Sequence, residues 1–276
     1  MRIDLHTHSN RSDGTDSPTE LVEKAKAAGL DVIAITDHDS TAGWDEAQVA
    51  ADRVGLTLVR GIEISTMCDG VSVHLLGYGF DPVDTPLVAE LDRILRGRDN
   101  RLPQLLAQLA EHDMPLTEDD VLAQSGNAAA SGRPHVADAM VAAGYVADRD
   151  EAFRDWLYDD GPAYVERYGA PLTAAIDLVT AAGGVSVIAH PWARRGRRVL
   201  TPEMLAGLAT RGLAGVEVDH NNHSADTRSE LRGLAADLGL VMTGSSDYHG
   251  TGKGPEFHLG ANTTDPDEYE RLLEGP

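Results

Sequence analysis

Two histidines separated by one residue stand near the start of the chain, where their spacing could build a metal site. His6 and His8 follow residues 2–5, which read as a short strand with alternating apolar positions. Residues i and i+2 of a strand point to the same face, so both imidazoles can reach one point. Imidazole suits Zn, Fe and related transition ions. Asp13 follows, beside Gly14, a residue that permits a tight turn. One such pair is a weak signal by itself, and the hypothesis requires partners from later strands.

Further histidines and carboxylates recur at or near the ends of the strands that follow. They are His38, Glu63, His74, His190, Asp247 and His249. The carboxyl ends of parallel strands meet at one rim of a barrel, where barrel enzymes place their active sites. Any one of these histidines alone would more often be a hydrogen-bonded core residue than a ligand. Burying all of them without a metal would leave many titratable groups unpaired, so the sequence predicts a metal centre.

Seven predicted strands position these side chains. They lie at residues 2–5, 32–36, 56–64, 71–80, 185–189, 215–219 and 240–244. Helical segments separate most of them, and the first helix begins at Ser17-Pro18-Thr19-Glu20, the pattern of a capping box with proline in the first turn. Alternation of strands and helices predicts a parallel sheet. Six or seven such units are enough to close a barrel.

The stretch from residue 85 to residue 168 interrupts this alternation. Leucines recur at helical spacing between residues 87 and 109, as one long helix or a broken pair, and Thr117 is a candidate N-cap for the next helix. Two more helices are expected at residues 134–143 and 148–158. The sequence therefore predicts a barrel formed by residues 1–84 and 169–276, with a helical insertion formed by residues 85–168.

Composition limits the expected partners. The formal net charge is −22, with 45 acidic against 23 basic residues. An acidic surface repels nucleic acid at long range, so a long duplex is not expected and nucleotide contacts must come from local arginine clusters. Cys68 is the sole cysteine, which suits a reducing compartment. We recognise neither a signal peptide nor a membrane span. A cytoplasmic protein is therefore expected, with no membrane contact and no obligate protein partner.

Five short motifs, in this order along the chain, resemble those of the polymerase and histidinol phosphatase (PHP) superfamily. They are His6-x-His8, Thr36-Asp37-His38-Asp39, Gly61-Ile62-Glu63, Ala189-His190-Pro191 and Ser246-Asp247-x-His249. The resemblance spans nearly the whole chain and implies an α/β fold, a distorted (β/α)7 TIM-like barrel, with two or three divalent metal ions (Mn, Fe or Zn). It implies that a first ion is held by His6, His8, Glu63 and Asp247. Glu63 would bridge to a second ion on His74 and His190, and a third would lie on Asp13, His38 and His249.

The helical insertion and its Gly132-Arg133-Pro134-His135 stretch resemble one branch of this superfamily. Members of that branch dephosphorylate nucleoside 3',5'-bisphosphates or shorten RNA from the 5' end, and the insertion caps the barrel mouth. The match marks Asn100, Arg101, Ser131, Arg133, His135 and His223 as substrate contacts. Arg98 and Arg194 join them from arginine clusters, because a guanidinium grips phosphate in a bidentate fork. The cluster at Arg194 could equally be a solvated face. Glu63, Asp247 and His223 are the catalytic candidates, although His223 could equally be an ordinary surface histidine.

The resemblance implies metal-dependent hydrolysis of phosphate monoesters, with AMP, a nucleoside 3',5'-bisphosphate or the 5' end of a short RNA as substrate. Metal coordination lowers the pKa of bound water from about 15.7 toward roughly 7, which provides hydroxide near neutrality. Two alternatives stay open: a histidinol-phosphate phosphatase on the same barrel, and a metal-stabilised accessory module without catalysis. An amidohydrolase is less favoured, because none of the three lysines lies at a predicted strand end.

Overall fold

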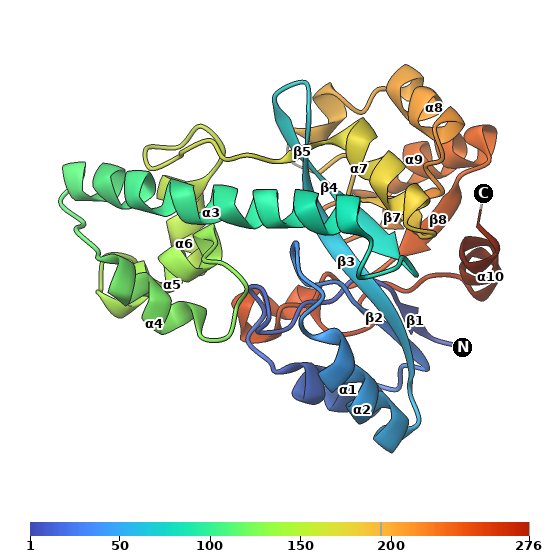
Figure 1. Ribbon diagram of the computed structural model, residues 1–276, viewed down its shortest axis with the longest axis horizontal. Helices are drawn as coiled ribbons and strands as arrows, with labels where there is room; N and C mark the ends of the chain where they lie inside the picture. Colours follow the sequence, from blue (N-terminus) through green and yellow to red (C-terminus); the bar gives the residue numbers. More distant parts are fainter. Residues whose placement is uncertain (194, 276) are drawn as a thin grey trace.

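A strongly curved sheet forms the centre of the computed structural model, which describes residues 1–193 and 195–275 (Figure 1). Its strands are β1 (Ile3–Asp4), β2 (Val32–Ile35), β3 (Thr57–Cys68), β4 (Val71–Tyr78), β5 (Ala170–Pro171), β6 (Val185–Ala189), β7 (Gly215–Asp219) and β8 (Val241–Gly244). Neighbours follow the order β1-β2-β3-β4-β6-β7-β8, and β5 pairs with β3 outside this path. Thr7 and Tyr248 form a parallel bridge just beyond β1 and β8. The sheet thus nearly closes, which confirms the predicted barrel.

Helices cover the outside of this barrel. They are α1 (Pro18–Ala27), α2 (Trp44–Val54), α7 (Leu172–Ala181), α8 (Pro202–Thr210), α9 (Ala225–Leu238) and α10 (Pro266–Glu274), with 3-10 turns η2 (Gly196–Arg198), η3 (Gly250–Gly252) and η4 (Pro255–Phe257). The predicted capping box opens α1: the Ser17 hydroxyl accepts from the Glu20 backbone, and the Glu20 carboxylate accepts from the Ser17 backbone. All four residues of β2 are buried, as its unbroken apolar run predicts.

One strand departs from the expected parallel sheet. β4 runs antiparallel to both β3 and β6. Asp69 and Gly70 alone join β3 to β4, with φ of 46° and 76°. Two consecutive positive φ values suit a hairpin turn, whereas a parallel neighbour needs a crossover of a dozen or more residues. His74 therefore lies in the first half of β4 rather than at its end. It still reaches the same rim, because it pairs with Ala189, the last residue of β6.

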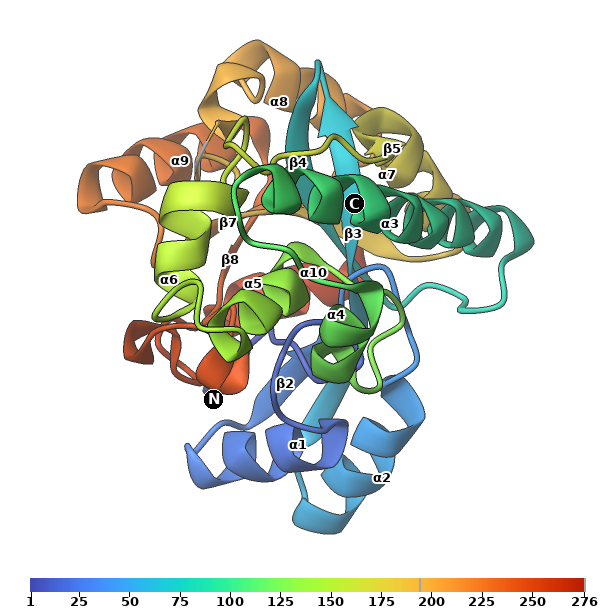
Figure 2. The same ribbon diagram turned by 90° about the vertical axis from the view of Figure 1, so that its left-hand side faces the viewer.

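Residues 85–168 form a helical layer beside the barrel mouth, at the left of Figure 1 and toward the viewer in Figure 2. Its elements are α3 (Thr85–Glu111), α4 (Glu118–Ser125), α5 (Arg133–Ala142), α6 (Arg149–Ala152) and a π-helical turn, η1 (Phe153–Leu157). α3 is a single helix of 27 residues that continues through Pro103. Its first half packs into the barrel core through Leu87 and Ile94, and its second half into a separate core around Leu109 and Met140.

Arg98, at the middle of α3, fastens the helical layer to the barrel. Its Nε and Nη2 atoms lie 2.9 and 2.7 Å from Asp39 Oδ2, and Nη2 also donates to Ser65 Oγ at 3.0 Å. Asp39 in turn accepts from the Ser65 backbone and hydroxyl at 2.7 and 2.8 Å. The Arg98 and Asp39 side chains are both buried. A buried pair of this kind makes the loss of either partner costly.

We therefore expect Arg98→Met to lower the free energy of unfolding by about 3 kcal/mol, because it leaves the Asp39 charge buried without its partner. Urea unfolding measures the loss. Arg96→Met, at an exposed position on the same helix, is the matched control and should stay within about 0.5 kcal/mol of the wild type. Equal losses in the two variants would contradict the anchoring role.

Candidate active site

The predicted metal ligands meet at the barrel rim. They are His6, His8, Asp13, His38, Glu63, His74, His190, Asp247 and His249. Three groups of them each bring one donor atom per residue within 4.8 Å of the others. The groups are His8, Asp13, His38 and His249; then His6, His8 and Asp247; then His38, Glu63 and His74. His190 lies outside these groups, but its Nε2 atom is 3.3 Å from Glu63 Oε1.

Glu63, in the middle of β3, is the carboxylate that most of the imidazoles face. Its Oε1 atom lies 2.7 Å from His74 Nδ1. Its Oε2 atom lies 3.3, 3.2 and 3.1 Å from ring nitrogens of His6, His8 and His38 respectively. Glu63 is held by its pairing with Leu76 of β4 on one side and by an isolated parallel bridge to His38 on the other. One buried oxygen surrounded by three imidazoles is the environment of a shared cation.

The ring nitrogens themselves test whether a metal fits. His6 Nε2 and His8 Nε2 lie 3.0 Å apart and point at each other. Two imidazole nitrogens so placed repel unless a proton or a cation lies between them. Asp247 Oδ1 is 3.5 Å from both. The i, i+2 spacing of the two histidines thus gives the convergence that their sequence predicted, and the donor set fits a divalent transition ion.

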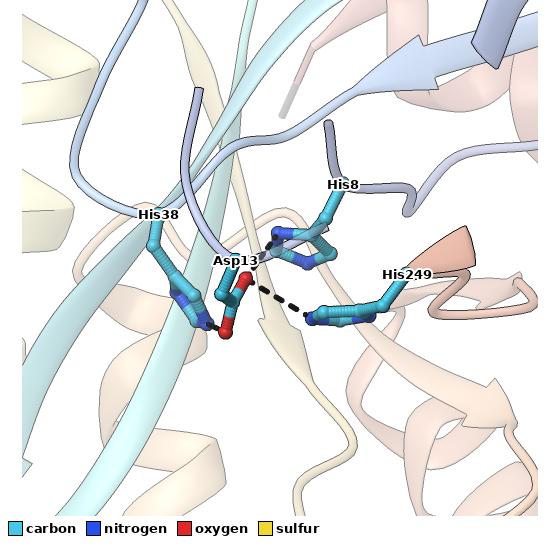
Figure 3. Close-up of side chains that lie close together, drawn as sticks. All are labelled: His8, Asp13, His38 and His249. Atoms are coloured by element: carbon cyan, nitrogen blue, oxygen red, sulfur yellow. Dashed lines mark ion pairs between the residues drawn. The ribbon is translucent and has the colours of Figure 1, made fainter. Parts of the chain in front are cut away.

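Asp13 lies among the imidazoles of His8, His38 and His249 (Figure 3). Its Oδ1 atom is 3.3 Å from His249 Nε2 and 3.7 Å from His8 Nδ1, and its Oδ2 atom is 3.7 Å from His38 Nε2. The loop that carries Asp13 is fixed by Asp37, which accepts hydrogen bonds from the Ser9 backbone and hydroxyl and from the Ser12 hydroxyl. The side chains of three distant segments therefore converge on one carboxylate.

The protonation states of Asp13, His249 and His38 match those of metal ligands. Burial opposes ionisation of Asp13, yet the adjacent His249 and His38 hold its pKa well below the ordinary value. Burial, then the charge of Lys253, lowers the pKa of His249 to about 4, and burial also lowers the pKa of His38. Ionised carboxylates and neutral imidazoles are the forms that bind metal ions. At His6 burial is outweighed by Glu63, Asp247 and Glu217, which raise its pKa well above the ordinary value, so a metal ion there must displace a proton.

Strained backbone marks the same rim. His190 and Asp247 have φ of 30° and 53°, in the left-handed region that residues with side chains seldom adopt. Such conformations persist where the surroundings enforce them, often at functional sites. Here the His190 N–H donates to Glu217 Oε2 at 2.8 Å, and the Asp247 N–H donates to the His6 carbonyl at 3.0 Å. Both candidates are thus aimed by backbone hydrogen bonds as well as by their strands.

Three residues that the sequence analysis did not single out support these candidates. Glu217, inside β7, places Oε1 3.2 Å from His6 Nδ1. The sequence feature that could have identified Glu217 is a charged residue within a buried, otherwise apolar strand. His220 Nε2 lies 3.2 Å from Asp247 Oδ2, and Lys253 pairs with the same oxygen. As predicted, Lys253 does not lie at a strand end. Its loop nevertheless folds back to the rim.

Glu217→Gln is expected to weaken metal binding by about tenfold, because the carboxylate that orients the His6 ring and raises its basicity is lost. Competition with a coloured chelator measures the metal affinity. Glu230→Gln, at an exposed glutamate of α9 that pairs with Arg197, is the control and should leave it unchanged. An unaltered affinity in Glu217→Gln would show that Glu217 supports only the fold.

A cavity of about 570 Å³ opens from the rim toward the helical layer. Its floor includes Asp13, His38, Glu63, His74, His190, Asp247 and His249, and five arginines line its wall: Arg98, Arg101, Arg133, Arg149 and Arg167. Arg167, which the sequence analysis missed, donates to Ser65 Oγ at 2.8 Å from the segment before β5. Burial lowers the pKa of its guanidinium to about 9. The cavity thus joins metal ligands to a cationic wall.

The other sequence candidates lie elsewhere. Asn100 is exposed on α3, because Arg98 and Arg101, three residues apart, take the face toward the cavity. Ser131 is buried against the Ser125 hydroxyl. His135 lines a small side cavity with Asp13 and His38. His223 Nδ1 donates to the Val218 carbonyl at 3.0 Å. Arg194 lies outside the described residues. Neither Asn100, Ser131 nor His223 is among the described residues that line the main cavity.

A barrel with histidines and carboxylates at its rim is the architecture of a class of metal-dependent enzymes. Within that class, the chain belongs to the PHP family. The family model described as PHP domain matches residues 4–116. The chain is 35% identical over 252 residues to a 3',5'-nucleoside bisphosphate phosphatase of Chromobacterium violaceum, covering 91% of this chain and 88% of that one. It is 34% identical over 248 residues to a 5'-3' exoribonuclease of Haemophilus influenzae, covering 90% of each.

A solved structure from Bifidobacterium adolescentis, assigned as a metal-dependent phosphoesterase, superposes with a TM-score of 0.92 at 40% identity. The match covers 98% of this chain and 95% of that one. The predicted family is thereby confirmed, together with its class, the metal-dependent phosphoesterases. That structural relative and the clustered donors indicate divalent metal binding. In the described part of the chain, no helix is both long and apolar enough to span a membrane.

Proposed function

We propose that this protein hydrolyses phosphate monoesters of nucleotides with the help of divalent metal ions. The substrates are mononucleotides such as AMP and nucleoside 3',5'-bisphosphates, or the 5' ends of short RNA. The observation that carries the proposal is one cavity whose floor is a cluster of metal-ligating side chains and whose wall holds five arginines. Such a cavity suits a substrate with a phosphate to cleave and a second phosphate to hold. The two relatives named above act on substrates of this kind.

The proposed ions are two or three of Mn, Fe or Zn, since imidazole and carboxylate donors accept all three metals. A first ion would lie on His6, His8, Glu63 and Asp247; a second on Glu63, His74 and His190; a third on Asp13, His38 and His249. When bound, the ions would offset phosphate charge and acidify a water molecule. Glu63 and Asp247 are the proposed catalytic carboxylates, because they fix the donor geometry around the reacting phosphate.

The arginines would bind and orient the rest of the substrate. Arg101 is buried and Arg167 is partly buried at the cavity wall, where a guanidinium can grip phosphate oxygens in a bidentate fork. Arg133 is held by the Leu157 carbonyl and Asp159 at 2.8 and 2.9 Å, so its position is fixed before the substrate arrives. Arg98 is tied to Asp39 and would act mainly by its charge.

We further propose that residues 85–168 act as a cap domain on a PHP barrel made of residues 1–84 and 169–276. The separate core around Leu109 and Met140 supports this division. Arg98, Arg101 and Arg133 all come from the cap, whereas the metal ligands come from the barrel. Substrate selection and metal chemistry would then reside on different parts of the chain.

Treatment with EDTA is expected to abolish phosphate release, and Mn²⁺ to restore it, because bound ions would both acidify water and offset the negative charge of the phosphate. The assay compares AMP, adenosine 3',5'-bisphosphate, a 5'-phosphorylated short RNA and histidinol phosphate. Equal release with and without chelator would contradict the proposal. Faster turnover of histidinol phosphate would favour a histidinol-phosphate phosphatase. Binding of metal and nucleotide without turnover would favour a non-catalytic accessory module.

A further inference from the structure

Two of the three phenylalanines in the chain line the main cavity. Neither phosphate binding nor metal binding requires an aromatic side chain there. Phe153 begins η1 in the helical layer, and Phe257 ends η4 in the loop after β8. Both side chains are partly exposed, whereas the third, Phe80, is buried in the barrel core. Phe153 also packs against the core of the helical layer. The ring faces that remain open to the cavity suit a ligand with an apolar face.

The two rings belong to segments that meet across the seam between helical layer and barrel. Arg149, one helical turn before Phe153, donates from Nη1 to the Gly252 carbonyl at 3.1 Å. Gly252 lies five residues before Phe257 in the same barrel loop. Figures 1 and 2 both show α6 beside this loop, drawn in orange-red. Phe153 and Phe257 therefore approach one stretch of the cavity from the two parts of the molecule.

The charged residues closest in sequence to the two rings are of both signs. Asp150 and Glu256 line the cavity there, and so do Arg149 and Lys253, whose charges are paired with Asp138 and Asp247. Because these two cations are already paired, this part of the lining attracts a phosphate less than Arg101 and Arg167 do. An uncharged aromatic group needs no such attraction. Each ring also borders a cation: Arg133 Cζ lies 5.9 Å from the centre of the Phe153 ring, and Lys253 Nζ lies 4.9 Å from that of Phe257.

We propose that Phe153 and Phe257 form a subsite for the base of a nucleotide, an inference that rests on the proposed phosphoesterase function. Every base has a π-face, so stacking on aromatic rings holds purines and pyrimidines with little regard to sequence. The adjoining cations, Arg133 and Lys253, lie where the phosphates of the same nucleotide can reach them. The subsite would select nucleotides over sugar phosphates and histidinol phosphate while accepting different bases.

The test uses two substrates that differ only in the base: adenosine 3',5'-bisphosphate and its abasic tetrahydrofuran analogue. Phe153→Leu and Phe257→Leu keep apolar volume but remove the ring. Each is expected to lower kcat/KM for the adenosine compound by roughly 5- to 100-fold, the range for one base stacked on one ring. The change should appear chiefly in KM, because stacking holds ground state and transition state alike. The loss on the abasic analogue should be several times smaller.

Phe153→Tyr and Phe257→Tyr retain a ring and should keep the preference for the adenosine compound. Phe80→Leu, in the core, is the matched control and should leave the ratio of the two substrates unaltered even if it lowers stability. Equal losses on both substrates, or no loss on either, would overturn the base subsite. Failure of the proposed function is a separate outcome, because wild-type protein with Mn²⁺ would then release phosphate from neither compound.

Discussion

Glu63→Gln is expected to abolish metal binding and phosphate release together. Glutamine keeps the shape of the side chain but removes the charge that five imidazoles face: those of His6, His8, His38, His74 and His190. Burial opposes ionisation of Glu63, yet the surrounding histidines, His38 foremost, hold its pKa well below the ordinary value. Glu63 therefore offers an ionised ligand near neutral pH.

The loss should be large because Glu63 would serve more than one ion. Metal ions at a phosphoryl centre supply several kcal/mol of transition-state stabilisation, so kcat is expected to fall by about 10³-fold or more. Metal content by mass spectrometry and phosphate release are measured on the same preparation, with circular dichroism to verify the fold. Glu230→Gln is again the surface control. A Glu63→Gln variant with full metal content and full activity would refute the assignment of the ligands.

The metal candidates were readable from the sequence because their geometry is local. His6 and His8 share a strand face by their spacing alone, and a buried strand that ends in His190 must deliver it to a rim. The departure at β4 was also local. The Asp69-Gly70 pair carries the hairpin signal, and attention to it would have predicted the antiparallel strand.

Part of the cavity wall could not be predicted in the same way. Arg167 and Lys253 reach it from irregular segments whose paths are set by tertiary contacts, such as the bond from Arg167 to Ser65. For Asn100, contact with the substrate stays a prediction. A match by motif places it with Arg101, but a helix rotates about 100° per residue, so neighbours in the sequence face different ways. His220 rather than His223 approaches Asp247 for a similar reason, since the turn after β7 fixes which ring points inward.

Arg101 is predicted to lower the stability of the ligand-free protein, although its charge favours binding of a phosphate. Its side chain is buried at the cavity wall, and among residues 1–193 and 195–275 no carboxylate forms an ion pair with it. Burial, then the neighbouring Arg167, Arg133 and Arg98, lower its pKa well below the ordinary value. A guanidinium nevertheless stays protonated in proteins. The free protein therefore holds repelling buried charges, and an anion such as phosphate would relieve that repulsion.

Arg101→Met should consequently change stability and binding in opposite directions. Without ligand, the urea midpoint is expected to rise, because an unpaired buried charge is replaced by an apolar side chain of similar length. KM for adenosine 3',5'-bisphosphate is expected to rise by about 10- to 100-fold, the equivalent of one charge-assisted contact of roughly 1.5–3 kcal/mol. Inorganic phosphate should raise the Tm of the wild type more than that of the variant. Arg96→Met, exposed on the same helix, controls for lost charge. A destabilised Arg101→Met with unchanged KM would mean that Arg101 serves the fold and not the substrate.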